Sequence, residues 1–220
     1  MQEPEQKNSL HKYTLGEELI SSISHGFGAL FAIIGTIILL YHSAVLSDSR
    51  KIVSSAIYGF SMIVLYIIST VYHSLARNRG KKVLRILDHC IIYILITGTY
   101  TPYCLVTLNG WLGFAMLGVL IAATIVGVTL SAIDFKKYGK FAMVCYLAMG
   151  WVAVFGIVKI YELLSFWGFF LLLLGGVFYT VGAILYGLGK RKKYIHSVWH
   201  FFVLAGTILQ YFSILYYVII

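Results

Sequence analysis

The chain has 220 residues, of which 60% are hydrophobic and only 11% are charged, and its mean hydropathy is +0.88. Soluble domains carry about 25% charged residues, so this composition excludes a soluble module and predicts an all-α polytopic membrane protein. The formal net charge of +9 fits a topology signal and contacts with anionic lipid head groups. It does not indicate nucleic-acid binding.

A polar tail at residues 1–19 is followed, within residues 20–220, by seven apolar runs. Each run approaches the length of about 20 residues that crosses a bilayer core. The runs cover residues 20–43, 53–75, 86–106, 110–132, 141–158, 165–188 and 197–220. The turn signal Asn109-Gly110 separates the third run from the fourth. We expect one transmembrane domain of seven helices, without a cleavable signal peptide.

Basic residues are distributed asymmetrically between the two ends of these spans. With seven spans, the tail and the second, fourth and sixth loops share one side, and that side holds 14 of the 17 lysines and arginines. Only Arg50, Lys51 and Lys159 lie on the other side. Because cytoplasmic segments carry the excess of basic residues, the amino terminus is predicted to be cytoplasmic and the carboxyl terminus extracytoplasmic.

Small residues inside the spans are interpreted as packing residues. Cys90, Cys104 and Cys145 all fall in apolar runs and form no CxxC pair, so they predict neither a disulfide framework nor a cysteine metal site. The glycines at Gly175-Gly176 suit close approach of two helices in lipid.

A pair of histidines opens the seventh run, directly after the basic block at residues 190–193. His196 and His200 are four residues apart, and residues at this spacing share one face of a helix, with Cβ atoms about 5–6 Å apart. This spacing suits two ligands of one metal ion. A pair of interfacial histidines without a metal is the alternative.

Further candidate ligands are expected at the same depth on other helices. His73 closes the second run, and Ser69 lies one turn before it on the same face. Asp88 opens the third run, and an acidic residue inside a membrane span is costly enough to indicate a function. The predicted topology brings these residues and the His196/His200 pair to the cytoplasmic side.

Three imidazoles with an open fourth position are typical of a catalytic zinc site. On this interpretation His73, His196 and His200 bind zinc, Asp88 binds and deprotonates a water molecule, and Ser69 supports Asp88, the water or an oxyanion. A structural polar cluster, or a zinc ion that only joins helices, remains the alternative.

Other polar residues near this depth have supporting or structural interpretations. Glu18 and His25 lie two turns apart near the start of the first span, where they can pair with each other or with the basic loops. His89 points about 100° away from Asp88 around the helix, which favours packing. Pro102 predicts a kink that opens space between helices, with room for an acyl chain as one option.

At these residues the sequence resembles the haemolysin III family of bacterial membrane proteins, within the wider superfamily of progestin and adipoQ receptors and alkaline ceramidases. The resemblance covers essentially all seven spans. Its motifs are Glu18 with His25, Ser69-xxx-His73, Asp88 followed by Gly98-Thr99-Tyr100-Thr101-Pro102, and His196-xxx-His200. One departure is Ser21, where the receptors have asparagine, and it puts receptor-type behaviour in doubt.

The resemblance implies a zinc ion held by His73, His196 and His200, with Ser69 and Asp88 beside it. It also implies a multi-pass protein of the bacterial plasma membrane. We expect membrane lipids as partners, including a lipid substrate, and the sequence leaves the oligomeric state open.

Three functions use these features differently. An intramembrane metal-dependent hydrolase of a lipid amide or ester uses every residue of the cluster. A sensor or receptor-like regulator of the membrane state needs zinc only to fix the helices. A pore-forming cytolysin is what the family name suggests, but a secreted toxin must first be soluble, and this chain has the composition of a protein inserted during synthesis.

Overall fold

A computed structural model of the protein describes residues 13–76, 78–188 and 192–220. All regular secondary structure in these residues is helical. Seven spans in it are long and apolar enough to cross a membrane, which confirms the predicted fold class. They are α1 (Leu15–Val45), α2 (Ser49–Ser74), α3 (Arg79–Pro102) with the π-helical turn η1 (Tyr103–Thr107), α4 (Trp111–Ile133), α5 (Phe135–Gly150) with the 3-10 segment η2 (Val152–Gly156) and α6 (Ile157–Leu163), α7 (Phe166–Leu188), and α8 (Ile195–Ile214) with the π-helical turn η4 (Leu215–Ile219). Five of the basic residues counted for the topology, Lys7, Lys12, Arg77, Lys190 and Arg191, lie outside the described ranges.

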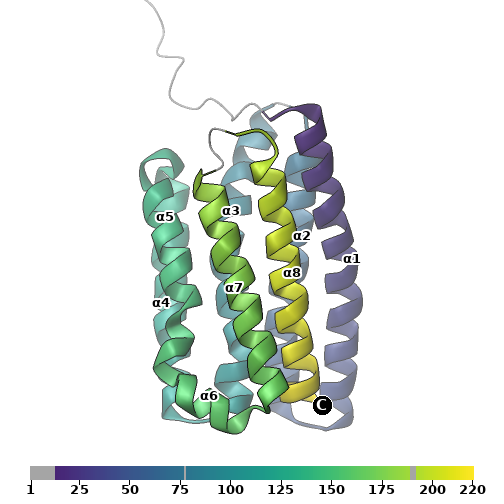
Figure 1. Ribbon diagram of the computed structural model, residues 1–220, viewed down its shortest axis with the longest axis vertical. Helices are drawn as coiled ribbons and strands as arrows, with labels where there is room; N and C mark the ends of the chain where they lie inside the picture. Colours follow the sequence, from purple (N-terminus) through teal and green to yellow (C-terminus); the bar gives the residue numbers. More distant parts are fainter. Residues whose placement is uncertain (1–12, 77, 189–191) are drawn as a thin grey trace, which may run out of the picture.

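The spans stand side by side along the long axis of the molecule (Figure 1). Each packs on the next in chain order, and α8 returns to α1, so the helices form a closed ring. The packing is dense between α1 and α2 and between α7 and α8, and it is sparse between α5 and α7. Many large apolar side chains are exposed on the outside, which suits a lipid-facing surface.

The first helix begins five residues before the apolar run that predicted it. Thr14 and Glu17 form a capping box, in which Glu17 N donates to Thr14 Oγ1 at 3.3 Å and Thr14 N donates to Glu17 Oε2 at 2.8 Å. These bonds satisfy amide groups that a helix start otherwise leaves unpaired. Glu18 therefore lies on the helix and not in an irregular tail.

The fifth span is interrupted, where the sequence predicts one continuous helix over 141–158. Its α-helix ends at Gly150 and gives way to the 3-10 segment η2. The hydroxyl of Tyr100, on α3, donates to Gly150 O at 2.6 Å and accepts from Ala153 N at 2.9 Å. Backbone groups freed within a membrane need such partners, so Tyr100 stabilises the break.

The small residues have two different roles. Cys90 and Cys104 are buried, Cys145 is partly exposed, and all three are free thiols, as expected. At Gly175 an added Cβ would lie 3.0 Å from Gly206 O, so this glycine allows α7 and α8 to approach closely. The same role was predicted for Gly176, but an added Cβ there meets open space.

Candidate metal centre

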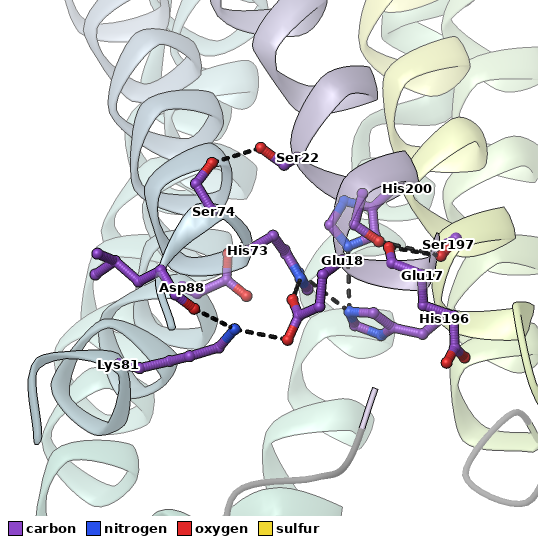
Figure 2. Close-up of polar contacts among 12 residues, drawn as sticks. Glu17, Glu18, Ser22, His73, Ser74, Lys81, Asp88, His196, Ser197 and His200 are labelled. Atoms are coloured by element: carbon purple, nitrogen blue, oxygen red, sulfur yellow. Dashed lines mark hydrogen bonds and ion pairs between the residues drawn. The ribbon is translucent and has the colours of Figure 1, made fainter. Parts of the chain in front are cut away.

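Three histidine side chains converge at one end of the ring. His73 lies in the last turn of α2, and His196 and His200 lie in the first turns of α8 (Figure 2). All three are buried, and each offers one nitrogen within 4.8 Å of the others. His196 Nε2 is 3.4 Å from His73 Nε2 and 3.2 Å from His200 Nε2.

These distances fit a tetrahedral metal site. Two ligand nitrogens that each lie about 2.0–2.1 Å from zinc, at tetrahedral angles, are separated by roughly 3.3 Å. The separations of His196 Nε2 from His73 Nε2 and from His200 Nε2 are both close to that value. Imidazole nitrogens are common ligands of zinc, so the three histidines suit this ion in both chemistry and spacing.

A partly buried carboxylate orients His73. Its Nδ1 lies 2.7 Å from Glu18 Oε2 on α1, so the protonated Nδ1 donates to the carboxylate and Nε2 is left as a ligand. The other oxygen of Glu18 accepts from Lys81 Nζ at 2.6 Å, and Lys81 also donates to Leu75 O at 2.8 Å. Figure 2 shows this chain from Lys81 through Glu18 to His73. Such second partners of a ligand fix its tautomer and direction.

Glu18 thus pairs with a basic residue beyond α2, one of the two options that the sequence left open, and not with His25. The ring of His25 instead lies 3.9 Å from the ring of His200, between centroids, and is 1% exposed. Neither of its nitrogens has a hydrogen-bond partner among the described residues. His25 is therefore a fourth imidazole beside the three candidate ligands.

Ser69 and Asp88 lie in a cavity beside the three histidines. Both side chains are buried, and both line a cavity of about 160 Å³ together with His25. Ser69 Oγ has no hydrogen-bond partner in the described part of the chain, so it is available to a molecule in the cavity. The three candidate ligands do not line this cavity themselves, and His25 and Trp199, which pack on His200, form its boundary there.

His89 has the packing role expected of it. Its Nδ1 donates to Arg85 O at 2.8 Å, which leaves Nε2 to accept from the hydroxyl of Tyr186 at 3.0 Å. It is not part of the three-histidine group.

Tyr13, just before α1, packs against two of the three histidines, His73 and His196. Its ring stacks on that of His196, with centroids 4.6 Å apart and an angle of 20° between the planes. Burial raises the pKa of Tyr13, so the hydroxyl stays neutral at physiological pH. Nothing in the sequence distinguished Tyr13 or Lys81 from the other polar residues near the first loops. Their contacts with His196 and Glu18 depend on the direction in which each side chain points, and the sequence does not give that direction.

Ser21, the departure from the receptor pattern, joins two helices. Its Oγ lies 3.2 Å from Ser197 Oγ on α8, and Ser197 Oγ donates to Glu17 O at 3.1 Å. Together with the bond between Glu18 and His73, these contacts hold α1, α2 and α8 around the centre.

Comparison with known proteins agrees with this architecture. The family model described as "Haemolysin-III related" matches residues 13–211. Hemolysin-3 of Bacillus cereus is 39% identical over 92% of each chain, and a Hemolysin-3 homolog of Bacillus subtilis is 38% identical over 93% of this chain and 96% of its own. The human monocyte to macrophage differentiation factor is 25% identical over 94% of this chain and 87% of its own. With its seven apolar spans, the chain belongs to the haemolysin-III related family of multi-pass membrane proteins, consistent with a place in the bacterial plasma membrane.

Proposed function

We propose that the protein is a zinc-dependent intramembrane hydrolase that cleaves an amide or ester bond of a lipid. One observation carries this proposal: three buried imidazole nitrogens, at the spacing of a tetrahedral zinc site, lie beside a largely apolar cavity that contains a serine and an aspartate. When bound, zinc supplies Lewis-acid chemistry and makes water reactive at neutral pH.

The residues of the chain supply the other steps. Asp88 takes a proton from the attacking water, whose oxygen forms a bond to the carbonyl carbon of the lipid. The hydroxyl of Ser69 donates to the carbonyl oxygen as negative charge develops there. The bond from carbon to the amine or alcohol then breaks, and Asp88 passes its proton to that leaving group. The apolar cavity holds the hydrocarbon chain of the lipid and excludes bulk water.

A regulatory protein with structural zinc is the second candidate. The positions of the histidines favour this candidate. A metal ion held by His73 on α2 and by His196 and His200 on α8 would join these two helices, and the bond between Glu18 and His73 would tie α1 to them. The separation of the three histidines from the cavity lining also suits this role. Cytolysis, which the names of the Bacillus relatives indicate for those proteins, is a third candidate, but an apolar cavity is a poor path for water and ions.

Incubation of the purified protein with a panel of membrane lipids, followed by mass spectrometry, separates these candidates. The hydrolase releases a fatty acid, loses this activity on chelation and regains it with zinc. A regulatory protein releases nothing from any lipid, although it contains zinc.

Truncation of one ligand tests the metal centre itself. The protein is expected to bind about one zinc ion per chain, and His200→Ala is expected to lose most of that zinc because one of three imidazoles is gone. Elemental analysis measures the content. His42→Ala, which changes a histidine at the far end of α1, is the matched control and should keep its zinc.

A further inference from the structure

The helix that carries two of the three candidate ligands begins with an unusual backbone conformation. Tyr194 is the N-cap residue of α8, and its φ of 64° and ψ of −9° lie in the left-handed region. Tyrosine is disfavoured there, because its Cβ crowds the following carbonyl oxygen. The helix follows at once, with His196 two residues later. The conformation of Tyr194 therefore sets the direction in which α8 leaves the loop, and with it the place of His196 and His200.

The hydrogen bond that holds this conformation comes from another helix. A helix start usually has a side chain that accepts from its first amide groups, but no side chain caps α8 in this way. Instead the backbone N–H of Tyr194 donates to Glu17 Oε1, in the first turn of α1, at 2.8 Å. Because Glu17 is only 5% exposed, water competes little for this bond. A buried carboxylate of α1 thus holds the left-handed residue in place.

Glu17 has the same role at two helix starts. In a capping box, a glutamate accepts from the backbone N–H of the N-cap residue, and Glu17 Oε2 accepts from Thr14 N in this way, at 2.8 Å. Glu17 Oε1 does the same for Tyr194, the N-cap residue of α8. The two oxygens of one carboxylate therefore serve two helices, and the negative charge is favourable at both amino-terminal ends.

Packing supports the same junction between α1 and α8. The side chain of Tyr194 lies directly over Gly16, where an added Cβ would lie 2.9 Å from the Tyr194 hydroxyl oxygen. Ser197 Oγ donates to Glu17 O at 3.1 Å, so the first turn of α8 also bonds to the backbone of α1. These contacts fix the start of α8 against the first turn of α1.

Two adjacent acids thus hold the two helices that carry the candidate ligands. Glu18 bonds to the ring of His73 on α2, and Glu17 bonds to the backbone at the start of α8. Consecutive residues point about 100° apart around a helix, and Figure 2 shows the two side chains leaving α1 in different directions. His196 Nε2 is 3.4 Å from His73 Nε2, so a small shift of the start of α8 would change this separation.

We propose that Glu17 is a positioning residue of the metal centre. Its bond to the Tyr194 N–H maintains the left-handed start of α8, and this start places the His196/His200 pair at binding distance from His73. Glu17 acts through the backbone of α8, whereas Glu18 acts on an imidazole ring. This inference rests on the metal centre of the proposed function and names a second residue that holds its shape.

Glu17→Gln tests the bond with little change in size. Glutamine has one oxygen, and its NH2 group cannot accept, so one of the two N-cap amide groups loses its partner. Competition with a chelator of known affinity, on the purified full chain in detergent, should show zinc affinity reduced by about 10–100-fold. Hydrogen exchange of the metal-free protein should be faster in the peptide that contains residues 194–198. Asp134→Asn is the control, because it makes the same charge change at the N-cap of α5, which carries no candidate ligand, and both measurements should stay unchanged.

A second substitution separates positioning from general stabilisation of α1. Asparagine adopts the left-handed region at less cost than tyrosine, so Tyr194→Asn needs the bond to Glu17 less. Glu17→Gln should therefore reduce zinc affinity at least about tenfold in the natural chain, but only about twofold in the Tyr194→Asn background. An equal loss in both backgrounds, or no loss in either, overturns the proposal. A chain that binds zinc and shows this difference, yet cleaves no lipid, supports the positioning role while the hydrolase proposal fails.

Discussion

The direction of His73 depends on two charged residues, Glu18 in the first turn of α1 and the buried Lys81 on α3. Glu18 and Lys81 are costly to bury in a membrane protein, and their ion pair offsets part of that cost. The remaining benefit is geometric, because the carboxylate fixes the His73 tautomer and leaves Nε2 facing the other two histidines. At the residue scale, the candidate metal site thus depends on a carboxylate that lies outside the three-histidine group.

Glu18→Gln tests this role. The amide keeps the size of the side chain but weakens its bonds to both His73 and Lys81, so zinc affinity should fall by about 10–100-fold, as for other partners of metal ligands. Competition with a chelator of known affinity measures the change. Glu162→Gln, which alters an exposed ion pair with Lys159, is the control and should leave zinc affinity unaltered. An unchanged zinc affinity in Glu18→Gln would show that the carboxylate does not support zinc binding.

At the scale of the elements, the interruption of the fifth span shapes the cavity. Neither hydropathy nor a proline marks it, since the interrupted stretch reads as one apolar run. Tyr100 meets the freed backbone groups from a different helix, so the break depends on a tertiary contact. Pro102, by contrast, ends α3, and a π-helical turn follows it.

Tyr100→Phe removes that contact and leaves the ring. Two partly buried backbone groups then lose a partner, at a cost of at most about 1–3 kcal/mol each, and the melting temperature should fall by roughly 2–4 °C for each kcal/mol. Thermal unfolding in detergent measures the shift. Tyr216→Phe changes a tyrosine that is 56% exposed, and it should unfold at the temperature of the natural chain. Equal melting temperatures for both variants would show that Tyr100 does not stabilise the break.

At the scale of the whole molecule, the centre requires that α2, α3 and α8 present their polar ends on one side. In the ring, the end of α2 and the start of α8 do meet, as His73 and His196 show. The basic residues assign this end to the cytoplasm, and that assignment remains a prediction from the sequence.

Reporter fusions test the orientation. A reporter after Ile220 should be active only outside the cytoplasm, and one inserted at Lys137 should be active only inside it. Alkaline phosphatase and green fluorescent protein provide such a pair of readouts. A cytoplasmic carboxyl terminus would place the metal centre at the outer face.

Much of this architecture can be predicted from the sequence, and the features that cannot be predicted have a common physical cause. Seven spans and the i, i+4 pair of His196 and His200 follow from hydropathy and helix periodicity, and each depends only on local residues. The inward turn of Lys81 and the difference between Gly175 and Gly176 depend on which side chains of other helices lie opposite. Periodicity along one helix carries no information about those partners.

Asp88→Asn, measured for zinc content and lipid turnover in the same preparation, tests the hydrolase most directly. The substitution keeps the shape of the side chain but removes the group that accepts a proton, so zinc should remain near one ion per chain. Turnover should fall by about 10²–10⁴-fold, the usual contribution of general acid–base catalysis. Loss of the zinc would make Asp88 a ligand, and undiminished turnover would remove it from the reaction; either result contradicts the mechanism proposed for this protein.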